Sequence, residues 1–354
     1  MRVPRRSRAR TVGPALAFLL AALSLAACSG KPSGTAASGT TSTARNTTTT
    51  TTLPPTTTTT LPPSLPAPAP IAAPAGDSAG AGQWAPAGRT VYGVPAVYET
   101  RVLPPGGSED AGIAWMDTKL LTAQLYSGSK SPGGGPYQFT APIQPAQAAS
   151  LVAAFNGGFL MASAGGGYFT EGKTIYPLVN GAASLVINAD GSVNVGAWGT
   201  DVSMTPGVIA VRQNLVPLVA GGQPTPQAAS ADWLSWGATC GPSSCSGPGI
   251  EDQWRSAVGV TANGALVYVA GPALNPLELA QLLVAAGVVR GMQLDINPDW
   301  PVFATYAPPA VGVPAGPSNG TSMEPASVQG PATFFNASWA RDFVTMSIRA
   351  IPAG

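Results

Sequence analysis

Residues 255–269 read Arg-Ser-Ala-Val-Gly-Val-Thr-Ala-Asn-Gly-Ala-Leu-Val-Tyr-Val, two short runs of strand-forming residues joined at Asn263-Gly264. An Asn-Gly pair between such runs is typical of a tight β-hairpin. The pattern also occurs earlier, where Asp190-Gly191 separates a strand expected over residues 184–189 from one over 192–195. The Asp-Gly pair predicts a type I′ turn. Hairpins therefore form the centre of the expected fold.

One helix is clearly marked downstream of the second hairpin. Asn275 is a suitable N-cap, Pro276 fits the first helical position, and Glu278 is spaced to bond back to the cap. Apolar residues then recur at spacings of three and four up to Gly287, which ends the helix. A strand is expected to follow over residues 288–295.

The composition favours strands over helices elsewhere in the chain. Charged residues make up 9% of the sequence, and its 43 Gly and 37 Pro suit short strands joined by tight turns. A second, shorter helix is expected near Pro145, before a strand over residues 151–155. The predicted class is α+β, with twisted mixed or antiparallel sheets, a few helices packed on them, and a disordered linker in front.

The chain divides into three parts by composition. Residues 1–27 are expected to form a lipoprotein signal peptide, 28–88 are rich in Thr, Pro and Ala, and 89–354 have a globular composition. The middle part has two Thr-rich runs, 47–52 and 56–60, and almost no residue that could bury a core. Such a segment is expected to be a disordered tether. The last part is long enough for one large domain or two fused halves.

The N-terminal part has the layout of an export signal. Five Arg residues precede an apolar stretch, and small residues then lead into Cys28. The sequence Leu25-Ala26-Ala27-Cys28 resembles the bacterial lipobox, which implies cleavage before Cys28 and lipidation of that residue. The alternative is an ordinary signal peptide with a cysteine there by chance. We expect an exported protein, lipid-anchored to the outer face of the bacterial cell membrane.

The net charge of the chain indicates which classes of partner it can bind. The formal net charge is +1, from 17 basic and 16 acidic residues, and removal of a leader with five Arg and no acid leaves 1 − 5 = −4. A mildly acidic chain without a Lys/Arg run lacks the footprint of a nucleic-acid binder. We therefore expect no nucleic acid as partner, and contact with the membrane through the lipid anchor alone.

The chain contains no histidine. Ser-His-Asp and Cys-His triads and His-ligated zinc are therefore excluded. We expect no metal and no cofactor, although oxygen ligands for a divalent cation leave little trace in a sequence, so this point stays open. With Cys28 lipidated, the two remaining cysteines, Cys240 and Cys245, are expected to form a disulfide outside the cytoplasm.

Polar residues end both expected helix–strand units. Asn156-Gly157-Gly158 follows the first strand and Asp295 ends the second. Loops at strand ends are where sites are usually built, although each stretch is also compatible with a plain turn. The combination with Arg255 favours a site.

Four stretches, in the same chain order, resemble the phosphodiester glycosidase family. They are Ala154-Phe155-Asn156-Gly157-Gly158-Phe159, residues 185–193, Arg255-Ser256-Ala257-Val258-Gly259-Val260, and residues 277–295. The resemblance covers most of residues 90–350. It implies a hydrolase of a sugar phosphodiester or a related cell-envelope glycan linkage, with a carbohydrate or sugar phosphate as substrate.

Catalysis is assigned to carboxyl groups, because paired carboxylates are the usual means of cleaving glycosidic bonds. Asp295 matches the family's strand-end carboxylate and is the first candidate for acid/base catalyst or nucleophile. Glu171 and Asp299 are the candidates for a second catalytic carboxylate.

Substrate binding is assigned to Arg255 and to Asn156-Gly157-Gly158. The planar guanidinium of an Arg donates two parallel hydrogen bonds, which suits a phosphate. Asn156 is expected to orient a hydroxyl or phosphate oxygen. The alternative for Arg255 is a salt bridge at the start of its strand with the acidic residues at 251 and 252.

The segment after Asp295 departs from the family. There the family has a Gly-rich segment, whereas residues 296–300 read Ile-Asn-Pro-Asp-Trp. Pro298 removes a backbone donor and Trp300 adds bulk. The alternative function is therefore a non-catalytic envelope glycan-binding or structural lipoprotein with a degenerate site.

Overall fold

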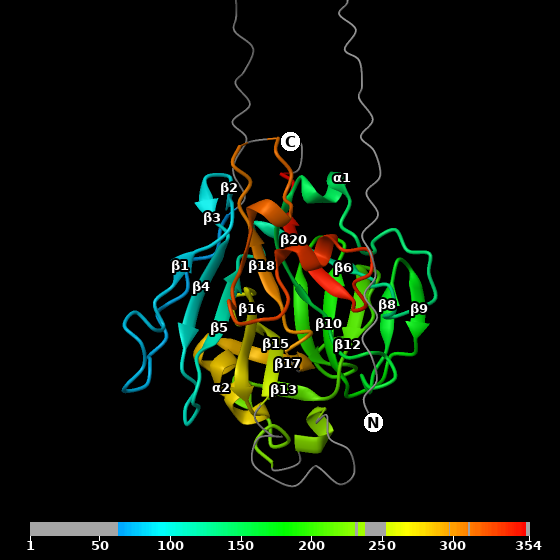
Figure 1. Ribbon diagram of the computed structural model, residues 1–354. Coiled ribbons are helices and arrows are strands. Elements are labelled where there is room, and N and C mark those ends of the chain that lie inside the picture. Colours follow the sequence, from blue (N-terminus) through cyan, green and yellow to red (C-terminus); the bar gives the residue numbers. More distant parts are fainter. Residues whose placement is uncertain (1–62, 231–232, 238–252, 297, 311, 352–354) are drawn as a thin grey trace, which may run out of the picture. The chain divides into compact units, whose positions relative to one another are not determined.

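The computed structural model describes residues 63–230, 233–237, 253–296, 298–310 and 312–351, in which three multistranded sheets form (Figure 1). The largest, here called the large sheet, has eight strands in the order β1 (Ala85–Pro86), β4 (Val97–Val102), β5 (Ala111–Met116), β16 (Leu266–Leu274), β15 (Gln253–Thr261), β17 (Val288–Ile296), β13 (Pro217–Ala220) and β14 (Gln223–Pro224).

Two five-stranded sheets complete the fold. The β12 sheet has the order β11 (Val193–Ala197), β10 (Ala183–Asn188), β12 (Val208–Gln213), β8 (Tyr168–Thr170) and β9 (Lys173–Tyr176). The β7 sheet has the order β19 (Gly320–Ser322), β18 (Phe303–Tyr306), β7 (Leu151–Asn156), β20 (Phe343–Ile348) and β6 (Leu121–Tyr126). The short strands β2 (Thr90–Val91) and β3 (Val94–Pro95) pair with each other, and 3₁₀ turns lie at η1 (Trp233–Trp236), η2 (Pro317–Asn319) and η3 (Pro331–Phe335).

The main apolar core is built by one face of the large sheet together with the two five-stranded sheets. It contains alternate residues of each strand, such as Val258 and Val260 of β15, Leu294 of β17 and Phe155 of β7. The opposite face of the large sheet packs against the leucines of α2 (Pro276–Ala285). Residues on β15 and β17 therefore point either toward the five-stranded sheets or toward the helix.

The structure confirms both hairpins but corrects the turn type. Strands β10 and β11 pair antiparallel, as do β15 and β16. Gly191 and Gly264 have positive φ (78° and 90°), whereas Asp190 does not. A type I′ turn needs positive φ at both central residues, so that prediction is wrong. The Asp190 carboxylate instead accepts a hydrogen bond from the backbone N–H of Ser192 (2.9 Å), which stabilises a conformation with negative φ.

The expected helix is α2, and its capping box is present. The side chain of Asn275 accepts from the N–H of Glu278 (2.9 Å), and the Glu278 carboxylate accepts from the N–H of Asn275 (3.0 Å). The helix expected near Pro145 is the single turn α1 (Pro145–Ala148), and β7 follows it. The named strands of the described residues all pair antiparallel, so the mixed sheets that were allowed for are not seen. The fold is mostly antiparallel sheet.

Residues 63–88, placed in the tether from their composition, lie along the large sheet. The backbone N–H of Leu65 donates to Oδ2 of Asp117 (2.7 Å), and Ile71 is 5% exposed. The indole N–H of Trp84 donates to the carbonyl of Ala69 (2.8 Å). These few apolar residues give an otherwise Pro- and Ala-rich segment enough burial to pack.

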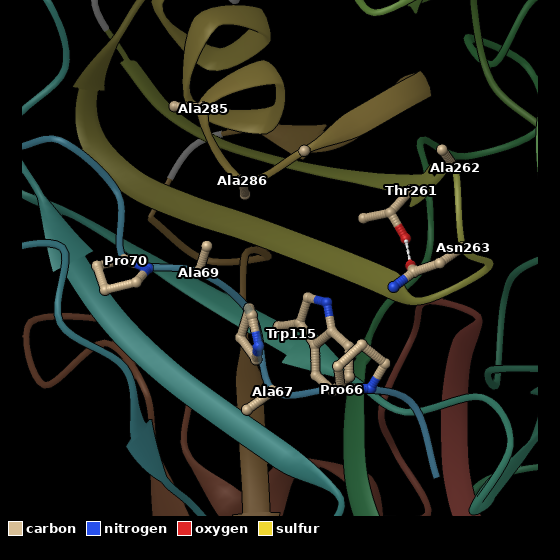
Figure 2. Close-up of a pocket in the computed structure, with 12 residues that line it drawn as sticks. Pro66, Ala67, Ala69, Pro70, Trp115, Thr261, Ala262, Asn263, Ala285 and Ala286 are labelled. Atoms are coloured by element: carbon tan, nitrogen blue, oxygen red, sulfur yellow. Dashed lines mark hydrogen bonds between the residues drawn. The ribbon is translucent and has the colours of Figure 1, made fainter. Parts of the chain in front are cut away.

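Figure 2 shows residues 66–70 of this segment passing Trp115. They line a groove of about 480 Å³ that extends to Ala285 and Ala286 at the C-terminal end of α2. Trp115 belongs to the apolar cluster on the helix side of the large sheet. No helix of the described residues is long and apolar enough to cross a membrane.

Candidate active site

Asp295 lies at the end of β17, where the pairing with β15 shifts by one residue. Continued in the register of the preceding residues, the pairing would set Asp295 opposite Arg255 and on the same face. Ile296 takes that place instead. Asp295 lies beside Ser256, whose Oγ hydrogen-bonds to the backbone N–H and C=O of Asp295 (3.2 and 3.1 Å). Such bulges re-aim a side chain, and this one separates Asp295 from Arg255.

The carboxylate of Asp295 pairs with Arg341, which lies two residues before β20 (Phe343–Ile348). Oδ2 of Asp295 lies 3.2 Å from Nε of Arg341, and the two side chains are 2% and 10% exposed. The pair has the distance of an ion pair but not the angle of a hydrogen bond. Oδ2 of Asp295 and both Nε and Nη1 of Arg341 are buried with no hydrogen-bond partner among the described residues.

Burial raises the pKa of Asp295 to about 7, although the charge of Arg341 and the backbone N–H of Ile296 act in the opposite direction. The Ile296 N–H donates to Oδ1 of Asp295 (2.9 Å). A carboxyl group with this pKa holds a proton in a large share of molecules near neutral pH. Proton transfer is the chemistry to which such a group is suited.

A second Arg–Asp pair lies beside the first and is fully bonded. Arg212 donates through Nε and Nη2 to the two oxygens of Asp342 (2.8 and 3.2 Å), and the hydroxyl of Ser131 donates to Oδ1 (2.8 Å). The remaining guanidinium contacts are with the carbonyls of Gln213 and Phe159. Bidentate pairs of this kind have a well-defined geometry. Arg212 and Asp342 are therefore held in place next to the Asp295–Arg341 pair.

The two glycines after β7 allow the side chains of Asp342 and Asn214 to lie close to the backbone of residues 157 and 158. A Cβ atom on Gly157 would lie 2.2 Å from Oδ2 of Asp342, and one on Gly158 would lie 2.6 Å from Oδ1 of Asn214. The N–H of Gly157 also donates to the carbonyl of Asp342 (2.8 Å). Glycine is needed at both positions for steric reasons.

Asn156 is the hydrogen-bonding centre beside the site. Its Oδ1 accepts from the hydroxyl of Tyr268 (2.6 Å) and the N–H of Val302 (3.1 Å), and its Nδ2 donates to Ser256 (3.0 Å) and to the carbonyl of Gly157 (2.8 Å). An Asn side chain has two donors and two acceptor positions, and all four are used. Asn156 therefore connects β7, β15, β16 and the segment that leads into β18.

A profile of the phosphodiester glycosidase family matches residues 149–295. This stretch of the chain is similar to that family. The match ends at Asp295 and includes Asn156, Arg212 and Ser256, but Arg341 and Asp342 lie beyond it. These last two residues join the candidate site through the pairing of β20 with β7.

Two solved structures are similar to this chain at low identity. One is the zebrafish N-acetylglucosamine-1-phosphodiester alpha-N-acetylglucosaminidase catalytic domain auto-inhibited by its pro-peptide, with 15% identity and a TM-score of 0.42 over 76% of this chain and 88% of that one. The other is a hypothetical protein from Synechocystis, with 11% identity and a TM-score of 0.37 over 75% of this chain and 64% of that one. The curated proteins contain no match.

Arg255 and Asp295 are not brought together. Arg255 is fully buried, and its guanidinium donates to the carbonyls of Leu274 (2.8 Å) and Trp236 (3.1 Å) and to Oε1 of Gln293 (3.0 Å). These contacts join the ends of β16 and β17 to η1. The acidic residues at 251 and 252 lie outside the described residues. Within the described part, Arg255 is used as a structural crosslink.

The two candidates for a second carboxylate lie apart from this pair. Glu171 is in the turn between β8 and β9, at the edge of the β12 sheet, where its carboxylate accepts from the N–H groups of Gln138 (3.0 Å) and Phe139 (2.9 Å). Asp299 is exposed on the segment after β17. Neither is buried with Asp295.

Three of the predicted positions, Cys28, Cys240 and Cys245, lie outside the described residues, as does Asn297. Among the residues that are described, no group of three or more Cys, Asp or Glu side chains is arranged to hold a metal ion.

The sequence analysis did not identify Arg212, Arg341 or Asp342. One local signal was present for the first, because apolar residues of β12 are followed by the polar run Arg212-Gln213-Asn214 at the end of the strand and just beyond it. Arg341 and Asp342 have no comparable signal, since a charged pair before a strand is commonly a solvated turn. Their burial, 8% and 0% exposed, follows from the packing of β20 between β6 and β7.

Proposed function

We propose that this phosphodiester glycosidase domain hydrolyses a sugar phosphodiester, with Asp295 as the proton-transfer group and Arg341 as the phosphate-binding group. The observation that carries the proposal is the difference between the two Arg–Asp pairs. Arg212 and Asp342 use their polar atoms on each other and on the protein, whereas Asp295 and Arg341 have buried polar atoms without hydrogen bonds. Unsatisfied buried groups of this kind are expected where a ligand supplies the missing partners.

The proposed reaction breaks the bond between the anomeric carbon of the sugar and the phosphate oxygen. Protonated Asp295 gives its proton to that oxygen as the bond breaks, and Arg341 stabilises the charge on the phosphate. The Asp295 carboxylate then takes a proton from the water that attacks the anomeric carbon. The products are a free sugar and a phosphate monoester, and Asp295 is protonated again.

The substrate class follows from the charges. Arg341 is the cation beside Asp295 with unused donors, so the ligand is expected to carry an anion near the bond that is cleaved. The family match supports a carbohydrate phosphodiester. The expected export signal and the lipobox-like sequence at Cys28 favour a substrate in the bacterial cell envelope and a lipid anchor on the outer face of the membrane.

The direct test is hydrolysis of an N-acetylglucosamine phosphodiester, followed by release of the free sugar. Asp295→Asn is expected to abolish turnover, and Arg341→Met is expected to lower it at least 100-fold, largely through KM. Glu171→Gln is the matched carboxylate control, and we expect it to keep turnover because Glu171 lies at another sheet edge. Retained turnover in Asp295→Asn, at an unchanged melting temperature, would remove Asp295 from the mechanism.

The anchor is tested separately. The N-terminal peptide of the protein isolated from membranes is expected to begin at Cys28 and to carry acyl chains by mass spectrometry. Cys28→Ser is expected to release the protein from the membrane fraction. A peptide that begins at another residue, without acyl chains, would show an ordinary signal peptide instead.

A further inference from the structure

Arg341 is held between a charge and an aromatic ring. Its Cζ lies 4.3 Å from the centroid of the Trp300 ring, while its Nε lies 3.2 Å from Oδ2 of Asp295. Because Nε and Nη1 make no hydrogen bonds to the described residues, charge attraction and stacking orient this guanidinium.

Trp300 is itself fixed from two sides. Its ring packs against Trp339 with centroids 5.6 Å apart, in an apolar cluster that also contains Phe334. Two residues further along, Val302 exchanges hydrogen bonds with Asn156, since its N–H donates to Oδ1 (3.1 Å) and its carbonyl accepts from the Asn156 N–H (3.1 Å). The segment after β17 is therefore tied to the end of β7, close to the residue that carries the indole.

On the basis of the function proposed above, we propose that Trp300 is a positioning residue that holds the Arg341 guanidinium beside Asp295 and leaves its free N–H groups for the phosphate of the substrate. The flat face of an indole supports a planar guanidinium without using any of its donors. A carboxylate or carbonyl in the same place would orient Arg341 equally well but would occupy those donors. An aromatic ring is thus suited to holding a cation that must still bind an anion.

If Trp300 holds Arg341 in place, replacing Trp300 should change the pKa of Asp295. The charged groups around Asp295 are Arg341 and Arg212, which lower its pKa, and Asp342, which raises it. Arg212 and Asp342 are held by their own hydrogen bonds. Loss of the indole should therefore free Arg341 alone, weaken its effect on Asp295 and raise the pKa of the carboxyl group.

The experiment compares Trp300→Phe, which keeps a ring, with Trp300→Leu and Trp300→Met, which keep apolar volume without one. All are made in the full-length protein, with Trp84→Leu as the control, because the Trp84 indole bonds to the carbonyl of Ala69 and not to Arg341. The first readout is the pKa of Asp295 from carboxyl carbon NMR, which needs no turnover. The second is kcat and KM for an N-acetylglucosamine phosphodiester.

We expect Trp300→Leu and Trp300→Met to raise the pKa of Asp295 and to lower kcat/KM roughly 10-fold, mostly through KM, the size expected for one cation–π contact. Trp300→Phe should stay within about 3-fold of the wild type, since a ring face remains. Two results would overturn the inference: an unchanged pKa in both ring-free variants, or an equal loss in Trp300→Phe, which would show that shape alone matters. If the wild type has no turnover, the proposed function fails, while the NMR measurement still decides the role of Trp300.

Discussion

Gly157 lies so close to Asp342 that a Cβ atom at position 157 would be 2.2 Å from the carboxylate oxygen Oδ2. The Asn-Gly-Gly sequence after β7 therefore supports the site indirectly, because it makes room for the Arg212–Asp342 pair. Asn156 and the two glycines were assigned to substrate binding from the sequence. In the structure, Asn156 uses all its polar groups on the protein, so its side chain connects the strands around the site.

Gly157→Ala is expected to destabilise the protein by roughly 2–4 kcal/mol, since the new methyl group must push a buried carboxylate away from its arginine. Chemical denaturation measures this. Gly316→Ala is the control, because φ at Gly316 is −171° and a Cβ atom there meets nothing within 4 Å. Equal stability of the two variants would mean that Asp342 is free to shift.

Arg255 and Arg341 should respond in opposite ways to replacement by lysine. Arg255→Lys is expected to cost about 2–4 kcal/mol of stability, because an ammonium group cannot reach the acceptors at Leu274, Trp236 and Gln293 together. Arg341→Lys should cost less than about 1 kcal/mol, since few hydrogen bonds are lost, but should lower kcat/KM at least 10-fold. Thermal unfolding and kinetics on both variants check the pattern. If instead Arg255→Lys lowers kcat/KM and Arg341→Lys lowers stability, Arg255 would be the phosphate-binding residue.

The pH dependence of turnover follows from the pKa of Asp295, which is about 7. If protonated Asp295 is the active form, kcat/KM should be constant below pH 6 and fall about 10-fold per unit above pH 8, because the fraction of protonated carboxyl falls by that factor. A rate that rises through the same range would instead assign Asp295 the role of a base or nucleophile.

A half-buried carboxyl group, Glu99 on β4, should make stability depend on pH. Burial, and then the nearby Glu324, raise the pKa of Glu99 to about 7. The folded protein therefore binds a proton that the unfolded chain loses near pH 4.5, so stability falls as pH rises from about 4.5 to 7. The total fall from Glu99 is expected to be roughly 1–3 kcal/mol.

Glu99→Gln removes this titration and should flatten the profile, with a gain in stability at pH 8. The exposed Glu109→Gln is the control. Melting temperatures at pH 5 and pH 8 measure both variants. An unchanged difference between the two pH values in Glu99→Gln would show that Glu99 is already ionised at pH 5.

The segment from residue 63 to residue 88 should behave as part of the domain. Ile71 is 5% exposed, so Ile71→Ala is expected to cost about 2 kcal/mol. Ala72→Ser, at an exposed neighbouring position, should change stability by less than about 0.5 kcal/mol. Urea denaturation of both variants measures the difference. No loss in Ile71→Ala would place the segment with the tether, as its composition suggested.

The local features of the fold were predictable from the sequence. The Asn-Gly and Asp-Gly hairpins, the capping box of α2 and the strands ending at Asn156 and Asp295 all depend on residues that are neighbours along the chain. Glycine conformations, caps and hydrophobic periodicity act over a few residues, so these elements could be placed before any tertiary contact was known. The predicted type I′ turn was wrong because Asp190 does not have positive φ. Its carboxylate accepts a hydrogen bond from the N–H of Ser192 instead.

Which residues meet at the site depended on the tertiary structure. Strand alternation alone places Asp295 on the face of Arg255, and a one-residue shift between β15 and β17 reverses this. Arg341 and Asp342 reach the site because β20 pairs with β7 across nearly two hundred residues of sequence. The chain by itself determined the strand ends and the candidate acid, Asp295, since those depend on local order. Pairing register and packing decided its arginine partner, because they depend on contacts between distant segments.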